Sequence, residues 1–411
     1  MDRPTRDPAA YDPSVPFWPI AAGVLLWFGA PWLTIGAWLH PWLPGGWLGV
    51  VALLLLVPVP VWTMVRGLRG VRAPSKAARL FIMRPFWYAA LIVPVLACVT
   101  LAGGAIGWAL GAAGAGGRLG LGIGALALTT MLIAGYFGAQ RLVVRPLEAH
   151  LPRLPPAFDG LRIVQISDLH VGPHTSTRFL ARVVDAVTAV RGDLVVVTGD
   201  QVDDYPSDAQ LFARAFAPLQ DAPLGVYAIA GNHDIFGGWP TVHRTLADAG
   251  FRVLVNDAVS IVRDGARLWL AGTGDPAAMH WPRADARAAA PNIDATLARV
   301  AAGEPVIALA HNPALWPLLA ARGVDLTLSG HTHYGQFAVP RRNWSLASPF
   351  LALAMGIHRR GRALLYINPG TNHWGIPFRL GTPPEVTVVT LRGAANGEAR
   401  IAPGTTRDAA A

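Results

Sequence analysis

The first third of the chain contains four long apolar stretches that carry no formal charge. They cover residues 17–39, 47–65, 86–107 and 119–140. About twenty apolar residues in a helix can cross a hydrocarbon core roughly 30 Å thick. A signal peptide followed by buried core helices fits less well, because the first stretch is too long and further apolar stretches follow it. The pattern predicts an α-helical membrane domain over residues 1–145 with about four transmembrane helices. Glycines thin the last two stretches, so a count of three or five also fits.

The apolar runs after a proline-rich connector at residues 151–156 are much shorter. Five runs rich in Val, Ile and Leu have the length of buried strands. They cover residues 161–167, 193–199, 225–231, 305–310 and 324–330. Residues with the apolar spacing of helices lie between them, at 176–190, 208–219 and 241–249. This alternation predicts an α/β domain over residues 151–391.

The end of the chain shows a different pattern. Residues 362–367 and 385–391 are expected to form a closing antiparallel pair of strands. Residues 392–411 are rich in Ala, Gly and Arg, and we expect them to form a disordered tail.

Much of the basic excess behind the net charge of +9 flanks the apolar stretches. Six basic residues and no acidic residue occupy the segment 66–84, between the second and third apolar stretches. Such an excess is typical of cytoplasmic loops. It predicts a multi-pass protein of the cytoplasmic (inner) membrane whose amino terminus and C-terminal domain share the cytoplasmic side, and it leaves no need for a nucleic-acid partner. The single cysteine, Cys98, excludes an intrachain disulfide and a thiolate metal site.

Each of the five short runs ends at side chains that can bind a metal ion. The seven candidates are Asp168, His170, Asp200, Asn232, His311, His331 and His333. Strand ends are where open α/β sheets place their chemistry. Imidazole and carboxylate ligands without sulfur suit Mn, Fe or Zn. Seven ligands are too many for one tetrahedral ion, and they fit two ions that share a bridging carboxylate, typically about 3.5–4 Å apart.

The ordered series Asp-x-His, Gly-Asp, Gly-Asn-His-Asp, His and Gly-His-Thr-His resembles the calcineurin-like metallophosphoesterases, over residues 161–391. Three further segments, beginning at Ser167, Asp193 and Gly375, are similar to the membrane-tethered bacterial branch of that family. The resemblance implies a two-layer β sandwich flanked by helices, and a metal-dependent phosphoric ester or diphosphate hydrolase. Relatives in this branch include UDP-2,3-diacylglucosamine pyrophosphatases and phosphodiesterases.

The resemblance also implies roles for individual residues. One metal would be held by Asp168, His170, Asp200 and His333, and the other by Asp200, Asn232, His311 and His331. His233 would contact the phosphate and protonate the leaving oxygen, with Asp234 orienting its imidazole. Independently of the resemblance, Asp203 and Asp204 follow Asp200 closely and are expected to cap the local backbone or to support the ligands, without binding metal themselves. Tyr334 departs from the family, which usually has Gly-Gly after the last motif, and this concerns substrate fit.

A mostly apolar stretch, residues 344–357, follows the last ligand and is bracketed by arginines. Two interpretations remain open: a segment that covers the core, or an element that enters the headgroup region of a membrane.

These features together predict a membrane-anchored phosphohydrolase with two divalent ions, Mn first and Fe or Zn as alternatives. Its expected substrate is a phosphodiester or diphosphate, including lipid-linked compounds such as UDP-2,3-diacylglucosamine. A general phosphodiesterase remains an alternative. So does a hydrolase domain that regulates a membrane sensor or transporter, although the apolar stretches lack the charged residues that transport usually needs.

Overall fold

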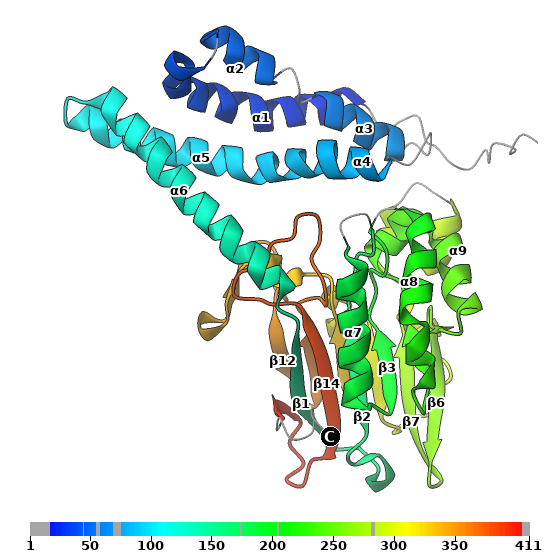
Figure 1. Cartoon of the computed structure of the whole chain (residues 1–411). Helices are drawn as coiled ribbons and strands as arrows, with labels where there is room; N and C mark the ends of the chain where they lie inside the picture. The colour runs from blue at the N-terminus through cyan, green and yellow to red at the C-terminus, as the bar shows by residue number, and fades with distance from the viewer. Residues whose placement is uncertain are drawn as a thin grey trace, which may run out of the picture. The chain divides into compact units, whose positions relative to one another are not determined.

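The computed structural model describes residues 17–43, 45–54, 58–68, 75–172, 175–203, 205–280 and 284–404 (Figure 1). Asp204, expected to support the metal ligands, lies outside these residues. The chain forms two compact units, Met1–Ala134 and Gly135–Ala411.

The first unit is helical. Its helices are α1 (Phe17–Leu39), α2 (Trp47–Leu54), α3 (Pro58–Leu68), α4 (Lys76–Ala78), α5 (Arg84–Ala109) and the greater part of α6 (Ala113–Gln140). A π-helical turn, Arg79–Met83, joins α4 to α5. The second apolar stretch is covered by α2 and α3, with residues 55–57 between them outside the described part of the chain.

Two helices among the described residues are long and apolar enough to cross a membrane, Lys76–Ala109 and Ala113–Gln140. They contain the third and fourth predicted stretches, and the count of about four spans stays a prediction. Glycines allow these two helices to approach closely: a Cβ on Gly103 would lie 2.5 Å from the carbonyl oxygen of Gly116, and one on Gly107 would lie 2.7 Å from the Cα of Gly116. Small residues spaced in this way are typical of packing between membrane helices.

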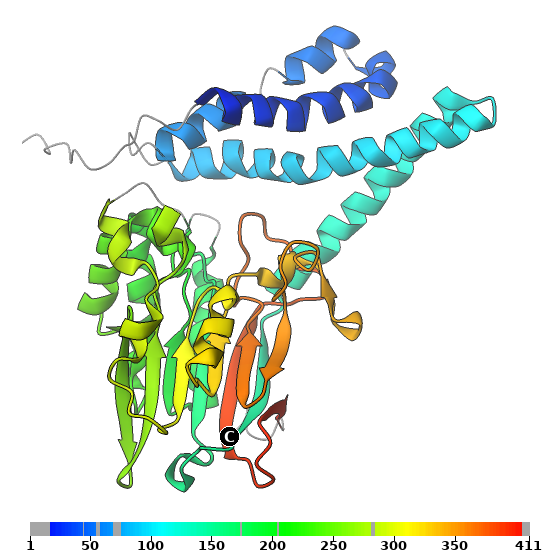
Figure 2. The same ribbon diagram turned by 180° about the vertical axis from the view of Figure 1, so that it is seen from behind.

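The second unit is a β sandwich. Its first sheet has the order β15-β1-β14-β2-β3-β4-β5 and its second β12-β13-β9-β8-β7-β6 (Figures 1 and 2). The first sheet consists of β1 (Val143–Leu151), β2 (Arg162–Ile166), β3 (Leu194–Val197), β4 (Val226–Ala228), β5 (Arg252–Val253), β14 (Glu385–Gly393) and β15 (Arg400–Pro403). The second consists of β6 (Asp257–Arg263), β7 (Ala266–Gly272), β8 (Val306–Leu309), β9 (Leu326–Ser329), β12 (Gly356–Arg360) and β13 (Ala363–Ile367). The strands β10 (Ala338–Val339) and β11 (Trp344–Ser345) form a small separate hairpin.

Alternating side chains on the strands separate the cores. On β3, Leu194 and Val196 face the second sheet, whereas Val195 and Val197 face the helices on the outer side, as the period of two in a strand requires. The helices on that side are α7 (Thr177–Val190), α8 (Ala209–Phe216) and α9 (Asn232–Asp248) (Figure 1). Short helices α11 (Ile293–Leu297) and α12 (Trp316–Ala321) pack on the second sheet, and α10 (Ala277–His280) packs beside α9. The expected α/β sandwich flanked by helices is confirmed.

Three expectations about the edges of this domain are wrong. The last two strands do not pair with one another, because β13 belongs to the second sheet and β14 to the first. The hydrolase unit begins before residue 151, since β1 pairs with β14 along its whole length. Residues 392–404 of the expected tail are ordered, and β15 pairs with β1 through Leu147–His150 opposite Arg400–Pro403; residues 405–411 lie outside the described part of the chain.

Candidate metal centre

The strands of the two sheets deliver the predicted ligands to one place. Asp168 and His170 follow β2, and Asp200 follows β3. Asn232 begins α9 after β4. His311 follows β8, and His331 and His333 follow β9. β2, β3 and β4 are parallel, and so are β8 and β9. The carboxyl ends of the two sets meet at the same end of the sandwich, because Nδ1 of His311, after β8, lies 2.8 Å from the carbonyl oxygen of Thr198, after β3.

Five of the seven candidates have a backbone conformation that L residues rarely adopt. Their φ angles are 53° at Asp168, 41° at His170, 52° at Asp200, 72° at His331 and 49° at His333. Such a conformation costs on the order of 1–3 kcal/mol for each residue and tends to persist at functional sites, where it aims the side chain. The cost is concentrated on the residues that converge here.

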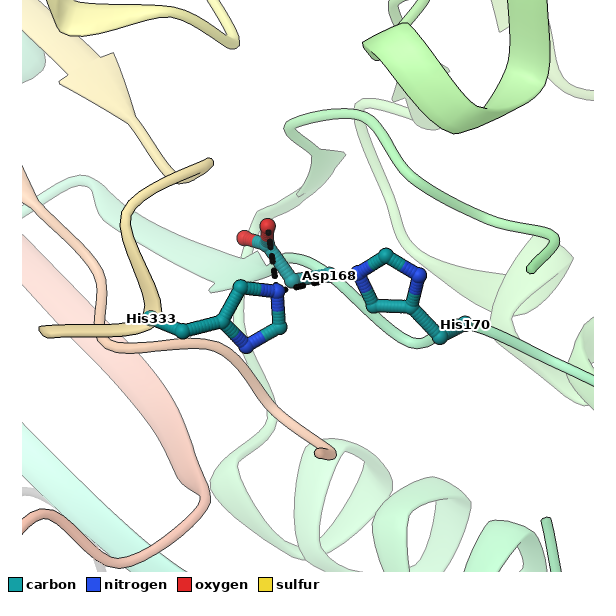
Figure 3. Close-up of side chains that lie close together, drawn as sticks. All are labelled: Asp168, His170 and His333. Atoms are coloured by element: carbon teal, nitrogen blue, oxygen red, sulfur yellow. Dashed lines mark hydrogen bonds and ion pairs between the residues drawn. The ribbon is translucent and has the colours of Figure 1, made fainter. Parts of the chain in front are cut away.

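Asp168, His170 and His333 form the first group of candidates (Figure 3). The Nε2 atoms of His170 and His333 lie 2.9 Å apart, and Nε2 of His333 lies 3.3 Å from Oδ1 of Asp168. All three side chains are buried. Two ring nitrogens and a carboxylate oxygen thus point at a common centre.

His311, His331 and Asn232 form the second group. Oδ1 of Asn232 lies 3.1 Å from Nε2 of His311 and 2.8 Å from Nδ1 of His331. Asp200 lies between the groups, because its Oδ2 is 3.5 Å from Nε2 of His170 and 3.3 Å from Nε2 of His311. The structure therefore brings all seven predicted residues together, with Asp200 between the two groups.

The electrostatics of the site favour positive charge at its centre. Burial by itself would raise the pKa of Asp168, but the charge and hydrogen bond of His333 outweigh it and hold that pKa well below its usual value. Burial likewise opposes the charged form of His311, yet the neighbouring Asp200 raises the pKa of His311 well above its usual value. Burial and the charge of His311 lower the pKa of His331 to about 4. A proton on His311 thus supplies positive charge that a cation would replace, since ligands release protons when a metal binds.

The donor set fits divalent metal ions. It contains imidazole nitrogens, two carboxylates and one amide oxygen, a combination that suits Mn, Fe and Zn. The carboxylate of Asp203 lies 3.5 Å from Nδ1 of His170, on the side away from Nε2. A carboxylate in that position is a common support of a metal-binding histidine.

His233 lies beside the ligands, but its partner is not the predicted one. The carbonyl oxygen of Asp203 lies 2.6 Å from Nδ1 of His233, so this nitrogen carries a proton and donates it to that oxygen. Asp234 instead accepts backbone N–H groups from Asp200, Gln201, Val202 and Gly231, at 2.8–3.1 Å. The expectation that Asp234 orients His233 is wrong, because its carboxylate is used to fold the loop that carries Asp200. Burial and the charge of Asp200 raise the pKa of Asp234 to about 7.

Arg379 is a site residue to which sequence reasoning gave no role. It is fully buried and places Nη2 2.9 Å from Nδ1 of His333. Its Nη1 donates to the carbonyl oxygens of His333 and Pro369, at 3.1 and 2.5 Å. Burial lowers its pKa to about 9. The only signal in the sequence was its place in the segment that begins at Gly375, which resembles the membrane-tethered branch.

Replacing Arg379 with methionine is expected to weaken metal binding roughly 10–100-fold, because the backbone that positions His333 loses the guanidinium that bonds the carbonyl oxygens of His333 and Pro369. Arg379→Lys keeps a positive charge but lacks the forked geometry of the guanidinium. Its metal affinity should therefore lie between those of the wild type and of Arg379→Met. Metal titration of the purified full chain measures the effect, with thermal unfolding as a check of folding. Unchanged affinity in a folded Arg379→Met protein would contradict this role.

Tyr334, which departs from the family pattern, has a structural role. Its φ is 52°, in the region that the usual glycine adopts without cost. Its hydroxyl donates to the carbonyl of Ile367 at 2.5 Å and accepts the N–H of Gly356 at 2.9 Å. The side chain is buried and fastens the start of β12 to β13.

Comparisons with known proteins agree with this site. The family described as calcineurin-like phosphoesterase matches residues 161–335. A transmembrane protein with a metallophosphoesterase domain from Bos taurus is 32% identical over 289 residues, which cover 66% of this chain and 62% of that protein. An uncharacterised metallophosphoesterase of Bacillus subtilis is 30% identical over 285 residues, covering 66% of this chain and 94% of that protein. The chain thus spans less than two thirds of the bovine relative and nearly all of the bacterial one.

Proposed function

The chain belongs to the calcineurin-like phosphoesterase family, and on that premise we propose that it is a membrane-anchored hydrolase that uses two divalent metal ions to cleave a phosphodiester or diphosphate. The reaction class, metal-dependent hydrolysis of a phosphoester, follows from the family. The observation that carries the finer proposal is the position of Asp200, whose Oδ2 lies within 3.5 Å of a histidine from each ligand group. One carboxylate between two sets of ligands is the arrangement of a dinuclear centre.

The assignment of ligands follows from these two groups. Asp168, His170 and His333 would hold one ion, and Asn232, His311 and His331 the other, with Asp200 shared. Bound there, two cations stabilise charge on the phosphoryl group and activate water at neutral pH. The ligand chemistry leaves the choice among Mn, Fe and Zn open, and we propose Mn for the first assays.

His233 is proposed as the general acid. Its backbone N–H donates to Oδ1 of Asp200 at 2.8 Å, so the residue is tied to the bridging ligand. Its ring lies 4.6 Å from the ring of His170, measured between centroids, and is half-buried. With Nδ1 donating to the carbonyl of Asp203, the protonated imidazolium of His233 could give its second proton, on Nε2, to the leaving oxygen of a phosphoester bound at the ligands.

The experiment that tests the reaction is a hydrolysis screen of the purified full chain with Mn. Its substrates should include bis-nitrophenyl phosphate, cyclic nucleotides, glycerophospholipids and UDP-2,3-diacylglucosamine. Chelation with EDTA should abolish turnover, and added Mn should restore it. No metal-dependent hydrolysis of any of these compounds would refute the proposal.

The proposed orientation places the hydrolase unit on the cytoplasmic side of the inner membrane, and rests on the basic segment 66–84. We therefore expect a fluorescent protein fused to the end of the chain to be bright and an alkaline phosphatase fusion at the same point to be silent. The reverse pattern would place the site outside the cytoplasm.

A further inference from the structure

The pairing of strands places the metal centre at the end of the hydrolase unit where α6 enters it. Val143, the first residue of β1, lies opposite Glu385, and Gln165 near the end of β2 lies opposite Thr387. The ligand loop after β2 and the last turn of α6 therefore lie at the same end of one sheet. Contacts inside the unit agree, since the N–H of Arg379 donates to the carbonyl of Gly135 at 2.9 Å.

The hairpin of β10 and β11 belongs to this end of the unit, because its first residue, Ala338, bonds Leu380, the neighbour of Arg379. We call Trp344, Leu346, Phe350 and Leu351 the apolar rim. Their side chains are 37%, 46%, 81% and 39% exposed. Large apolar groups gathered on an exposed turn mark a site of interaction rather than a packing surface.

The apolar rim is displayed by an ordered backbone. The N–H of Leu346 donates to the carbonyl of Phe337 at 2.8 Å, and the N–H of Phe350 to that of Ala347 at 3.0 Å. Ser345 and Ala347, which alternate with rim residues, are buried. The hairpin is also tied to the segment that holds α6, because the N–H of Ala338 donates to the carbonyl of Leu380 at 2.9 Å.

The charge around the rim is positive. Arg341 and Arg342 are exposed at the tip of the hairpin, and residues 336–361 contain no acidic side chain. Apolar side chains beside arginines are the composition of elements that lie in the headgroup region of anionic membranes.

A short path leads from the hairpin to the proposed acid. Gln336 precedes β10, and its side chain bonds the backbone of Trp374 twice, at 3.0 and 2.9 Å. The ring of Trp374 is 47% exposed and lies 5.8 Å from the ring of His233, measured between centroids. The hairpin is thus connected to the proposed acid through Gln336 and Trp374.

We propose that the apolar rim and its two arginines enter the headgroup region of the membrane that α6 crosses, and that the enzyme takes a phosphoester or diphosphate whose other part stays anchored in the bilayer. This inference rests on the proposed function for its chemistry and on α6 as a membrane span for its geometry. A bilayer is the partner that fits, because α6, a helix apolar enough to cross one, enters at the same end of the unit.

The first test measures the depth of the rim in the full chain. In a Cys98→Ser background, Phe350→Cys carries an environment-sensitive dye, and the protein is placed in nanodiscs of phosphatidylcholine with phosphatidylglycerol. The matched control is Val262→Cys, which is 59% exposed and lies near the β6–β7 turn at the opposite end of the unit. Brominated lipid should quench the dye at residue 350 and leave residue 262 unaffected. Equal quenching at both positions would overturn the proposal.

The second test measures selectivity. Leu346→Ser with Phe350→Ser should reduce turnover of UDP-2,3-diacylglucosamine or a glycerophospholipid in nanodiscs roughly tenfold or more. Hydrolysis of bis-nitrophenyl phosphate and metal content should stay unchanged, since neither residue contacts a ligand. Equal effects on lipid and soluble substrates would overturn the proposal. Failure of the wild-type chain on every substrate would refute the proposed function instead, and the quenching test would still report on the rim.

Discussion

Replacing Asp200 with asparagine is expected to remove most of the metal and nearly all activity. The carboxylate lies between the two ligand groups, so the substitution weakens both ion sites at once and removes a negative charge that holds them together. Stabilisation of the transition state by metal ions amounts to several kcal/mol. A loss of about 4 kcal/mol corresponds to a fall in kcat/KM of roughly 10³-fold. The measurements are metal content by mass spectrometry and turnover of bis-nitrophenyl phosphate.

Three comparison variants make the result specific. His170→Ala and His331→Ala each remove a ligand from one group only, so both should retain more metal than Asp200→Asn. Asp193→Asn changes a carboxylate at the other end of β3, where it accepts the N–H of Arg162 at 2.8 Å, and it should leave the metal in place. Full metal occupancy with normal turnover in Asp200→Asn would end the dinuclear proposal.

Replacing His233 with alanine is expected to separate chemistry from metal binding. A general acid contributes about 10²–10⁴ in rate, so kcat should fall by that factor while both metals remain bound. Substrates with a nitrophenolate leaving group should lose much less, because that group departs without a proton. The dependence of kcat on leaving-group pKa, in wild type and variant, is the decisive measurement.

The control for His233 lies on the same helix. His243, also on α9, packs against Trp239 with ring centroids 5.4 Å apart, so His243→Ala should leave the leaving-group dependence unchanged. If His233→Ala lost metal without a specific effect on kcat, His233 would be a ligand. A ring nitrogen of His233 does lie close enough to bind a metal ion, since His170, Asp200 and His233 offer ligand atoms within 4.8 Å of one another.

The candidate metal ligands, and the fact that they converge, could be predicted from the sequence because each follows a strand that the local pattern reveals. The alternation of Leu194, Val195, Val196 and Val197 identifies β3, and the residue types after each strand carry the chemistry. Parallel pairing then brings the strand ends together without further information. The family resemblance supplied the grouping of the ligands around Asp200, which the distances in the structure support.

The features that the sequence did not predict depend on contacts between distant parts of the chain. Asp234 follows His233 directly in sequence, yet its four bonds go to backbone at Gly231 and in the loop 200–202. Arg379 reaches His333 across 46 residues. No periodic pattern reports such partners. The edge strands were missed because β1 sits directly after an apolar helix, and β15 lies in a segment whose composition is that of a tail.

The position of β1 determines where the enzyme can be divided. A fragment that began at the proline-rich connector would leave β14 with a bare edge and β15 without a neighbour, and exposed strand edges lead to aggregation. A fragment that began at β1 would restore the sheet but deprive the N–H of Arg379 of the Gly135 carbonyl. The hydrolase unit and the last turn of α6 are therefore one folding unit. Crystallisation of the hydrolase unit alone needs a start before residue 135, with polar substitutions on the exposed face of that turn.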